Sequence, residues 1–172
     1  MTEAWRIRPA DEADLAALAL VGAATFIESF AGVIDGAGVV AHCARHHSEE
    51  AYSDYLANGA QAWLAEVAPG HAPVGYALLC TPELEIAMPG DIELKRIYVF
   101  SRFHGGGIAA ALMTAALAAA RGSARLLLGV KDDNRRAIAF YRKHGFEPVG
   151  TRDFDVGGHS YHDLVLARPL TD

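Results

Sequence analysis

The sequence contains only two cysteines among its 172 residues, Cys43 and Cys80, and they do not form a C-x-x-C pair. This spacing indicates neither a disulfide framework nor a redox pair, so we expect both thiols to be reduced. No window approaches the roughly 18 unbroken apolar residues of a membrane span. The residues from Met1 to Glu3 also lack a basic segment followed by an apolar stretch. The sequence therefore predicts a cytoplasmic protein without a membrane partner.

Basic residues are few and scattered. The chain has 15 Lys and Arg against 21 Asp and Glu, which gives a net charge of -6, and no basic run could follow a phosphate backbone. Nucleic acid is therefore not an expected partner. The sequence also lacks internal repeats and low-complexity linkers, and its 52% hydrophobic content is enough to bury one core. We expect residues 1–172 to form a single domain.

Apolar periodicity and turn residues predict the order of the secondary structure. Strands are expected at residues 5–8, 61–67, 74–80, 91–100, 124–130, 148–156 and 160–167. Helices are expected at residues 11–30 with a break near Gly22, and at 39–46, 49–56, 108–121 and 134–144. Asp11 and Ser48 can cap two of them, and Gly157-Gly158 is a turn signal between the last two strands.

The stretch from Arg102 to Gly107, Arg-Phe-His-Gly-Gly-Gly, joins an expected strand to an expected helix. The first N–H groups of a helix have no intrahelical partner, so together with the helix dipole they can bind a phosphate. Glycines permit a positive φ and a close approach of the ligand, and Arg102 can add a charged contact. A glycine-rich turn that only begins a helix and binds no ligand would have the same sequence pattern. The loop alone therefore indicates an anion site without proving one.

A second motif makes the pattern specific. Residues 134–146 read Asn-x-x-Ala-x-x-Phe-Tyr-x-x-x-Gly-Phe, and they follow an apolar strand some twenty-five residues after Arg-x-x-Gly-x-Gly. Together the two motifs resemble the GNAT superfamily of N-acetyltransferases over residues 91–146, with strands before and after in the family's order. The resemblance implies an α/β (mixed α+β) three-layer fold. We expect a mixed, mostly antiparallel sheet of six to seven strands, splayed between residues 100 and 124, with about four helices on its two faces.

The resemblance also implies acetyl-CoA as cosubstrate. In the family, the strand matching Ile97, Tyr98 and Val99 pairs with the pantetheine, which is strand addition by a ligand. The matching loop cradles the pyrophosphate, and the matching asparagine contacts the cofactor. The expected cofactor-binding residues are Ile97, Tyr98, Val99, Arg102, His104, Gly105, Gly106, Gly107, Ile108, Ala109, Asn134 and Tyr141. Relatives often carry a basic or bulkier residue in place of Gly106, so one contact is expected to be missing.

Acetyl transfer to an amine requires an acceptor for the amine's proton and a donor for the departing thiolate. The family's tyrosine, here Tyr141, commonly lies near the thioester sulfur, and a phenol is protonated at neutral pH. Tyr141 is therefore the candidate general acid, although it could also simply pack on the sheet. Glu93 is the candidate base and would accept the amine proton directly or through water. A solvated or salt-bridged strand glutamate without a catalytic role is an equally good interpretation of this residue. Asp91 and Glu85 are weaker candidates.

Three shorter motifs resemble one branch of the family, the PaiA-like bacterial polyamine N-acetyltransferases. They are Thr-Phe-x-Glu-Ser-Phe at residues 25–30, the strand at 92–99, and Phe154-x-x-Gly with Asp163-Leu164. This resemblance implies a small polyamine as acceptor and is compatible with a homodimer. Phe26, Glu28 and Phe30 could then line the site of a cationic chain. Core packing is the simpler reading of the two phenylalanines.

Other functions fit parts of the sequence. Gly105-x-Gly107-x-x-Ala110 matches a loose dinucleotide fingerprint, but leucines occupy the place of the acidic residue that a nicotinamide-dependent oxidoreductase needs. Histidines at 42, 46 and 47 beside Cys43 do not amount to a metal site without a second set of ligands, so no metal is expected. An acetyltransferase for another small amine or for a protein N-terminus, and a non-catalytic acyl-CoA sensor, remain open.

Overall fold

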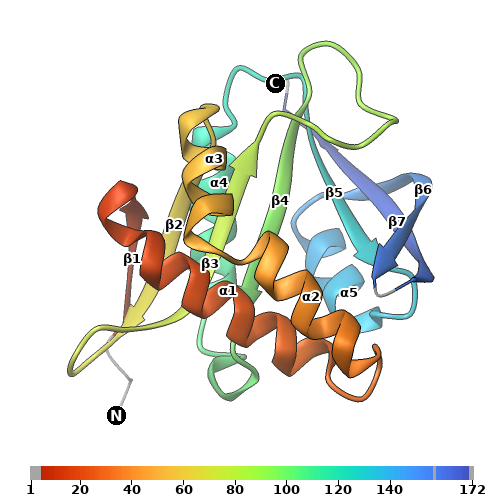
Figure 1. Cartoon of the computed structure of the whole chain (residues 1–172). Helices are drawn as coiled ribbons and strands as arrows, with labels where there is room; N and C mark the ends of the chain where they lie inside the picture. The colour runs from red at the N-terminus through yellow and green to blue at the C-terminus, as the bar shows by residue number, and fades with distance from the viewer. Residues whose placement is uncertain (1–4, 157, 171–172) are drawn as a thin grey trace.

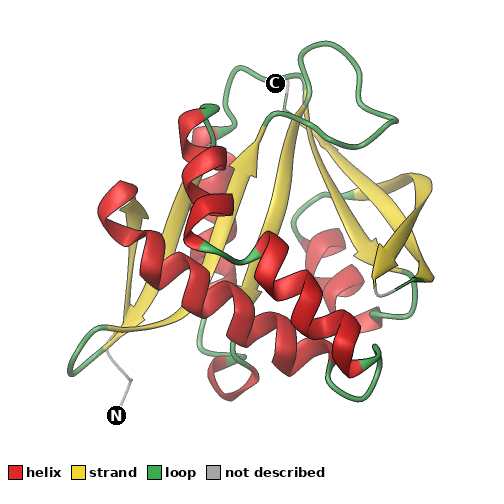
Figure 2. Ribbon diagram, viewed as in Figure 1, coloured by secondary structure: helices red, strands yellow, loops and turns green. Residues whose placement is uncertain are grey.

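The computed structural model describes residues 5–156 and 158–170. Its centre is a seven-stranded sheet in the order β1-β2-β3-β4-β5-β7-β6 (Figures 1 and 2). All neighbouring strands are antiparallel except β4 and β5, which are parallel. The mixed, mostly antiparallel sheet expected from the sequence is therefore confirmed. The strands are β1 (Trp5–Ala10), β2 (Gln61–Val67), β3 (Ala72–Cys80), β4 (Ile92–Val99), β5 (Arg125–Lys131), β6 (Glu147–Val156) and β7 (His159–Pro169).

Helices cover both faces of the sheet, five rather than about four. The helices are α1 (Leu15–Phe30), α2 (Gly36–His46), α3 (Glu49–Ala57), α4 (Ile108–Ala119) and α5 (Arg135–Lys143), with short 3-10 turns at Glu12–Asp14 and Ser101–Phe103. Leu18 and Tyr52, from α1 and α3, pack on one face against Leu64 and Leu78. On the other face, side chains of α4 and α5 pack on the sheet in a larger cluster. The sheet thus has a layer of helices on each side.

The helix α1 is continuous, so the expected break near Gly22 is wrong. A β-carbon at Gly22 would overlap the Tyr52 hydroxyl and lie 2.6 Å from His47 Nδ1, so glycine lets α1 pack closely against these side chains. Residues 12–30 are long and apolar enough, by length and composition, to cross a membrane. In this fold Leu18 and Val21 of the same helix are buried in a cluster with side chains of β2 and β3.

Local sequence signals placed several helix ends correctly. The Asp11 carboxylate accepts a hydrogen bond from Ala13 N, and Ser48 accepts one from Ala51 N. The side-chain oxygens of Asp11 and Ser48 satisfy N–H groups that the first helical turn leaves free.

Of the expected Gly157-Gly158 turn, Gly157 lies outside the described residues, as do residues 1–4.

The strands β4 and β5 pair only at their first residues. Their register joins Ile92 to Leu126 and Glu93 to Leu127, whereas β4 continues to Val99. Beyond the paired residues the two strands diverge, as Figure 1 shows. The splay expected between these strands is therefore present, and it opens toward the loop that precedes α4.

A bulge in β4 decides which side chains face α1, α2 and α3. The register shifts so that Arg96 lies opposite Leu78 while Leu94 lies opposite Leu79, which leaves Lys95 as the extra residue. Residues directly opposite in an antiparallel pair share a face. Leu78 packs with α1 and α3, so Arg96 faces the same helices. Leu94 packs in the cluster on the opposite face, with α4 and α5. Its neighbour Glu93 therefore points to the same side as Arg96, toward α1, α2 and α3.

Candidate active site

The loop between β4 and α4 presents unpaired backbone N–H groups to the splay. Gly105 and Gly107 have φ of 82° and 87°, the left-handed region that favours glycine. The N–H of Ala111 bonds to Gly107 O at 3.0 Å, whereas those of residues 108–110 precede the first helical hydrogen bond. No side chain caps the helix. The N-terminus of α4 is therefore open to an anion, as the sequence predicted.

Two side chains hold this loop in shape. Trp5 Nε1 donates a hydrogen bond to Gly106 O at 3.1 Å, and a ring nitrogen of His104 lies 2.7 Å from Val99 O. His104, expected as a cofactor contact, thus joins the loop to the end of β4. Trp5 was missed by sequence reasoning because it is 101 positions away from Gly106.

The backbone of β4 presents alternate residues to the splay. Phe100 N bonds to Val74 O of β3 at 2.9 Å, and hydrogen-bonding direction alternates along an antiparallel strand. The backbone groups of Tyr98 therefore point to β3, while those of Ile97 and Val99 point to the opening beside β5. Of the three residues expected to pair with pantetheine, Ile97 and Val99 have their backbone groups on the side of the opening, where Val99 O is in contact with His104.

The second motif brings Asn134 and Tyr141 to α5. The exposed Asn134 is the N-cap residue, and its side-chain oxygen accepts from Ala137 N at 3.2 Å, which leaves its NH₂ group available. Tyr141 is buried in the cluster formed with α4, and its ring lies edge-on to Phe140 and Phe146. Burial raises the pKa of Tyr141 above its usual range. Its hydroxyl is therefore protonated at neutral pH and can donate a proton.

Glu93 is buried rather than solvated, with 1% of its surface exposed. Its carboxylate accepts a hydrogen bond from Glu83 N at 2.7 Å, and Lys95 Nζ lies 3.8 Å away. The weaker candidates are less suitable as bases. Asp91 accepts two hydrogen bonds from Arg125, which lower the pKa of its carboxyl group, and Glu85 is exposed at the surface.

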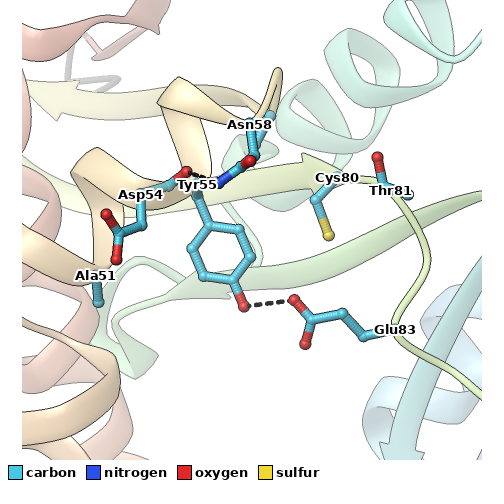
Figure 3. Close-up of a pocket in the computed structure, with 8 residues that line it drawn as sticks. Ala51, Asp54, Tyr55, Asn58, Cys80, Thr81 and Glu83 are labelled. Atoms are coloured by element: carbon cyan, nitrogen blue, oxygen red, sulfur yellow. Dashed lines mark hydrogen bonds between the residues drawn. The ribbon is translucent and has the colours of Figure 1, made fainter.

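A pocket of about 360 Å³ opens beside α3 and the end of β3 (Figure 3). Its lining residues are Ala51, Asp54, Tyr55, Asn58, Ala60, Cys80, Thr81 and Glu83. The Tyr55 hydroxyl donates to Glu83 at 3.0 Å, and Lys95 Nζ donates to the same carboxylate at 2.6 Å. The backbone N–H of Glu83 donates a hydrogen bond to the Glu93 carboxylate. Glu83 therefore connects the pocket to Glu93. Sequence reasoning missed Tyr55 and Glu83 because neither belongs to a motif.

None of the three residues expected to line an acceptor site lines the pocket beside α3. Phe26 is 5% exposed, and its ring stacks on His42 at 4.2 Å and tilts against Phe30 at 4.5 Å. The Glu28 carboxylate accepts hydrogen bonds from Ser101 N at 3.0 Å and Ser101 Oγ at 2.8 Å. Glu28 thus ties α1 to the start of the cofactor loop and does not line the pocket beside α3.

Three histidines gather where α2 meets α3. The rings of His42 and His46 lie 4.5 Å apart, and His47 Nδ1 lies 3.0 Å from the Tyr52 hydroxyl. Burial lowers the pKa of His42 to about 4 and that of His47 to about 3, with a contribution from the nearby Arg96 charge. Both imidazoles are therefore neutral at pH 7. Within the described parts of the chain, no three His, Cys, Asp or Glu side chains are placed to share a metal ion.

Opposite effects are expected from substitutions at neighbouring glycines of the loop. Gly107→Ala should weaken acetyl-CoA binding roughly tenfold, because a left-handed conformation costs a non-glycine residue about 1–2 kcal/mol. Gly106 has no such φ, and a β-carbon there meets only Phe103 O, at 3.4 Å. Gly106→Arg should therefore tighten binding several-fold at low salt by adding a cation beside the phosphates. Calorimetric titration checks both changes. Equal affinities in all three proteins would place the phosphates elsewhere.

Comparisons with known proteins identify the family of this chain. The model of the Acetyltransferase (GNAT) family matches residues 36–146. An uncharacterised N-acetyltransferase of Mycobacterium tuberculosis is 36% identical over 155 residues, which are 89% of this chain and 96% of that protein. A peptidyl-lysine N-acetyltransferase of Salmonella typhimurium is 31% identical, over 73% of this chain and 76% of its own. The crystal structure of the PaiA N-acetyltransferase of Thermoplasma acidophilum, in complex with coenzyme A, has a TM-score of 0.75 at 19% identity, covering 96% of this chain and 99% of that one.

Proposed function

We propose that this chain, which belongs to the acetyltransferase (GNAT) family and uses acetyl-CoA, transfers the acetyl group to a primary amine bound on the α1–α3 side of β4. The observation that carries the proposal is the splay between β4 and β5. At its open end lies the uncapped N-terminus of α4, which suits the pyrophosphate. Glu93 projects from β4 toward the helices that would enclose the acceptor, and Tyr141 lies in the core on the α4–α5 side.

In the proposed reaction, the amine nitrogen attacks the thioester carbonyl carbon of acetyl-CoA directly. The new C–N bond forms and the C–S bond breaks, so the products are an N-acetylated amine and free coenzyme A. Tyr141 donates its proton to the departing thiolate. Glu93 accepts the proton that the amine loses, directly or through water. The burial of both side chains supports these roles, because it strengthens their interaction with charge that develops in the reaction.

The acceptor class is the open part of the proposal. A small polyamine is the candidate that the sequence motifs favour, and Asp54 and Glu83 at the pocket beside α3 would attract a cationic chain. A lysine side chain of a peptide is the second candidate, because a relative at 31% identity is a peptidyl-lysine N-acetyltransferase. A cytoplasmic location and a homodimer are compatible with both candidates.

Cofactor binding and turnover test the proposal in one preparation. Calorimetric titration with acetyl-CoA should give micromolar affinity, and thiol release should depend on an added amine. The acceptor panel contains spermidine, spermine, small monoamines and a lysine-containing peptide. Failure to bind acetyl-CoA would refute the proposal, whereas binding without thiol release for any amine would favour an acyl-CoA sensor.

A further inference from the structure

Arg96 is a buried cation without a carboxylate partner among the described residues. Its side chain projects from β4 toward α2 and α3, with 9% of its surface exposed, and its Nη1 has no hydrogen-bond partner. Other buried charges in the fold are paired: Glu66 binds Arg6 and Arg8. Removing a guanidinium from water without a partner is unfavourable, so the buried position of Arg96 requires an explanation.

The surroundings of Arg96 are polar enough to bind a ligand group but carry little compensating charge. The Arg96 Cζ lies 5.3 Å from the ring centroid of Tyr52 and 5.5 Å from that of Tyr55. Tyr76, fully buried on the adjacent strand, has a hydroxyl that also lacks a hydrogen-bond partner. The histidines near Arg96 are neutral at pH 7, so they add no competing positive charge. Arg96 Nη1 and the Tyr76 hydroxyl, two donor groups without a hydrogen-bond partner among the described residues, thus lie in one buried region.

This region adjoins the proposed acceptor site. Tyr55 lines the pocket of about 360 Å³ (Figure 3). Arg96 itself does not line the pocket, but its Cζ lies 5.5 Å from the centroid of the Tyr55 ring. The bulge at Lys95 places Arg96 and Glu93 on the same face of β4. Strands rise about 3.3 Å per residue, so the two side chains leave the strand roughly 7–10 Å apart. A ligand that reaches both needs an amine at one end and an anionic group several bonds away.

We infer that the acceptor is a primary amine that also carries a carboxylate, separated from the reacting nitrogen by a carbon chain as in the side-chain amines of ornithine and lysine. Arg96 binds this carboxylate through its free Nη1, and the Tyr76 hydroxyl donates a second hydrogen bond to it. Glu93 accepts the proton of the distant amine. The inference rests on the proposed acetyl transfer, and it competes with the polyamine candidate because a polyamine has no group for Arg96.

Matched pairs of acceptors isolate the carboxylate. Lysine differs from cadaverine, and ornithine from putrescine, only by this group. For the wild-type protein, kcat/KM for thiol release should be at least tenfold higher with the amino acid of each pair. In Arg96→Met the ratio should fall to about one or below, and in Tyr76→Phe it should fall partly. Arg45→Met removes an exposed arginine of α2 and should keep the wild-type ratio. Unchanged acetyl-CoA affinity confirms that each variant is folded.

Calorimetric titration of lysine and cadaverine into the coenzyme A complex separates this inference from the proposed reaction. Binding that favours lysine and loses this preference in Arg96→Met, without turnover of any amine, would support the carboxylate site and refute the acetyl transfer. Thiol release that favours cadaverine in the wild type would overturn the inference while the proposed reaction stands. A preference for the amino acids that persists in both Arg96→Met and Tyr76→Phe would also overturn the inference.

Discussion

Replacement of Tyr141 by phenylalanine is expected to lower kcat at least tenfold and to leave the Kd for acetyl-CoA nearly unchanged. Phenylalanine keeps the ring that packs on Phe140 and Phe146 but removes the proton donor for the thiolate. An interaction made only in the transition state lowers kcat without changing ground-state binding. Thiol release at saturating cosubstrates gives kcat, and calorimetric titration gives the Kd.

The pKa of Tyr141 adds a second expectation to this comparison. A phenol donates its proton only below its pKa, and burial raises that pKa, so the donor form persists through the alkaline range of an ordinary assay. The wild-type rate should therefore show no alkaline decline from Tyr141 up to about pH 9. Tyr161→Phe, on β7, serves as the control and should retain full activity. An unchanged kcat in Tyr141→Phe would remove this residue as general acid.

The backbone of the proposed cofactor half was predictable because it depends on local geometry. Glycines with a positive φ, a strand before them and an apolar helix after them occupy one continuous stretch, from Ile97 to Ala109. Each element of that stretch follows from short-range rules on helix termini and glycine conformation. Asn134, expected as the first residue of a helix, is the N-cap of α5, and Tyr141 lies on the buried side of that helix.

The proposed acceptor half was not predictable because its residues meet only in the folded chain. Tyr55 comes from α3, Glu83 from the loop after β3 and Arg96 from β4, and none has a distinctive neighbouring sequence. The bulge at Lys95 reverses the alternation of side chains along β4, so a simple two-residue period would put Arg96 on the wrong face. Registers of this kind are set by pairing with a distant strand.

Residue type alone does not decide between a packing role and a ligand-binding role for Phe26, Glu28 and Phe30. The resemblance to the polyamine branch suggested Phe26, Glu28 and Phe30 as lining for a cationic chain, while core packing was the simpler interpretation of the two phenylalanines. In the fold the carboxylate binds Ser101, and Phe26 is buried against His42. The same side-chain chemistry serves packing and loop anchoring, and only tertiary contacts distinguish these roles from ligand binding.

Replacement of Glu93 by glutamine is expected to lower kcat/KM at pH 7 by about a hundredfold, within the range typical of a lost general base. Glutamine has the shape of glutamate, and its side-chain oxygen can still accept the hydrogen bond from Glu83 N, so the fold around β4 should persist. A primary amine with a pKa near 10 is almost fully protonated at pH 7, so turnover depends on a group that takes its proton. Thiol release measured from pH 6.5 to 9.5 with the best acceptor of the panel checks this expectation.

The pH dependence distinguishes a base from a residue that only shapes the site. As pH rises toward the pKa of the amine, more acceptor is already deprotonated, so the deficit of Glu93→Gln should shrink by about an order of magnitude over that range. A structural defect would give the same deficit at every pH. Glu85→Gln removes an exposed carboxylate from the same region and should behave as wild type. A Glu93→Gln profile parallel to that of the wild type would assign proton removal to water or to another carboxylate, and Glu83, hydrogen-bonded to Tyr55 at the pocket, would be the next residue to replace.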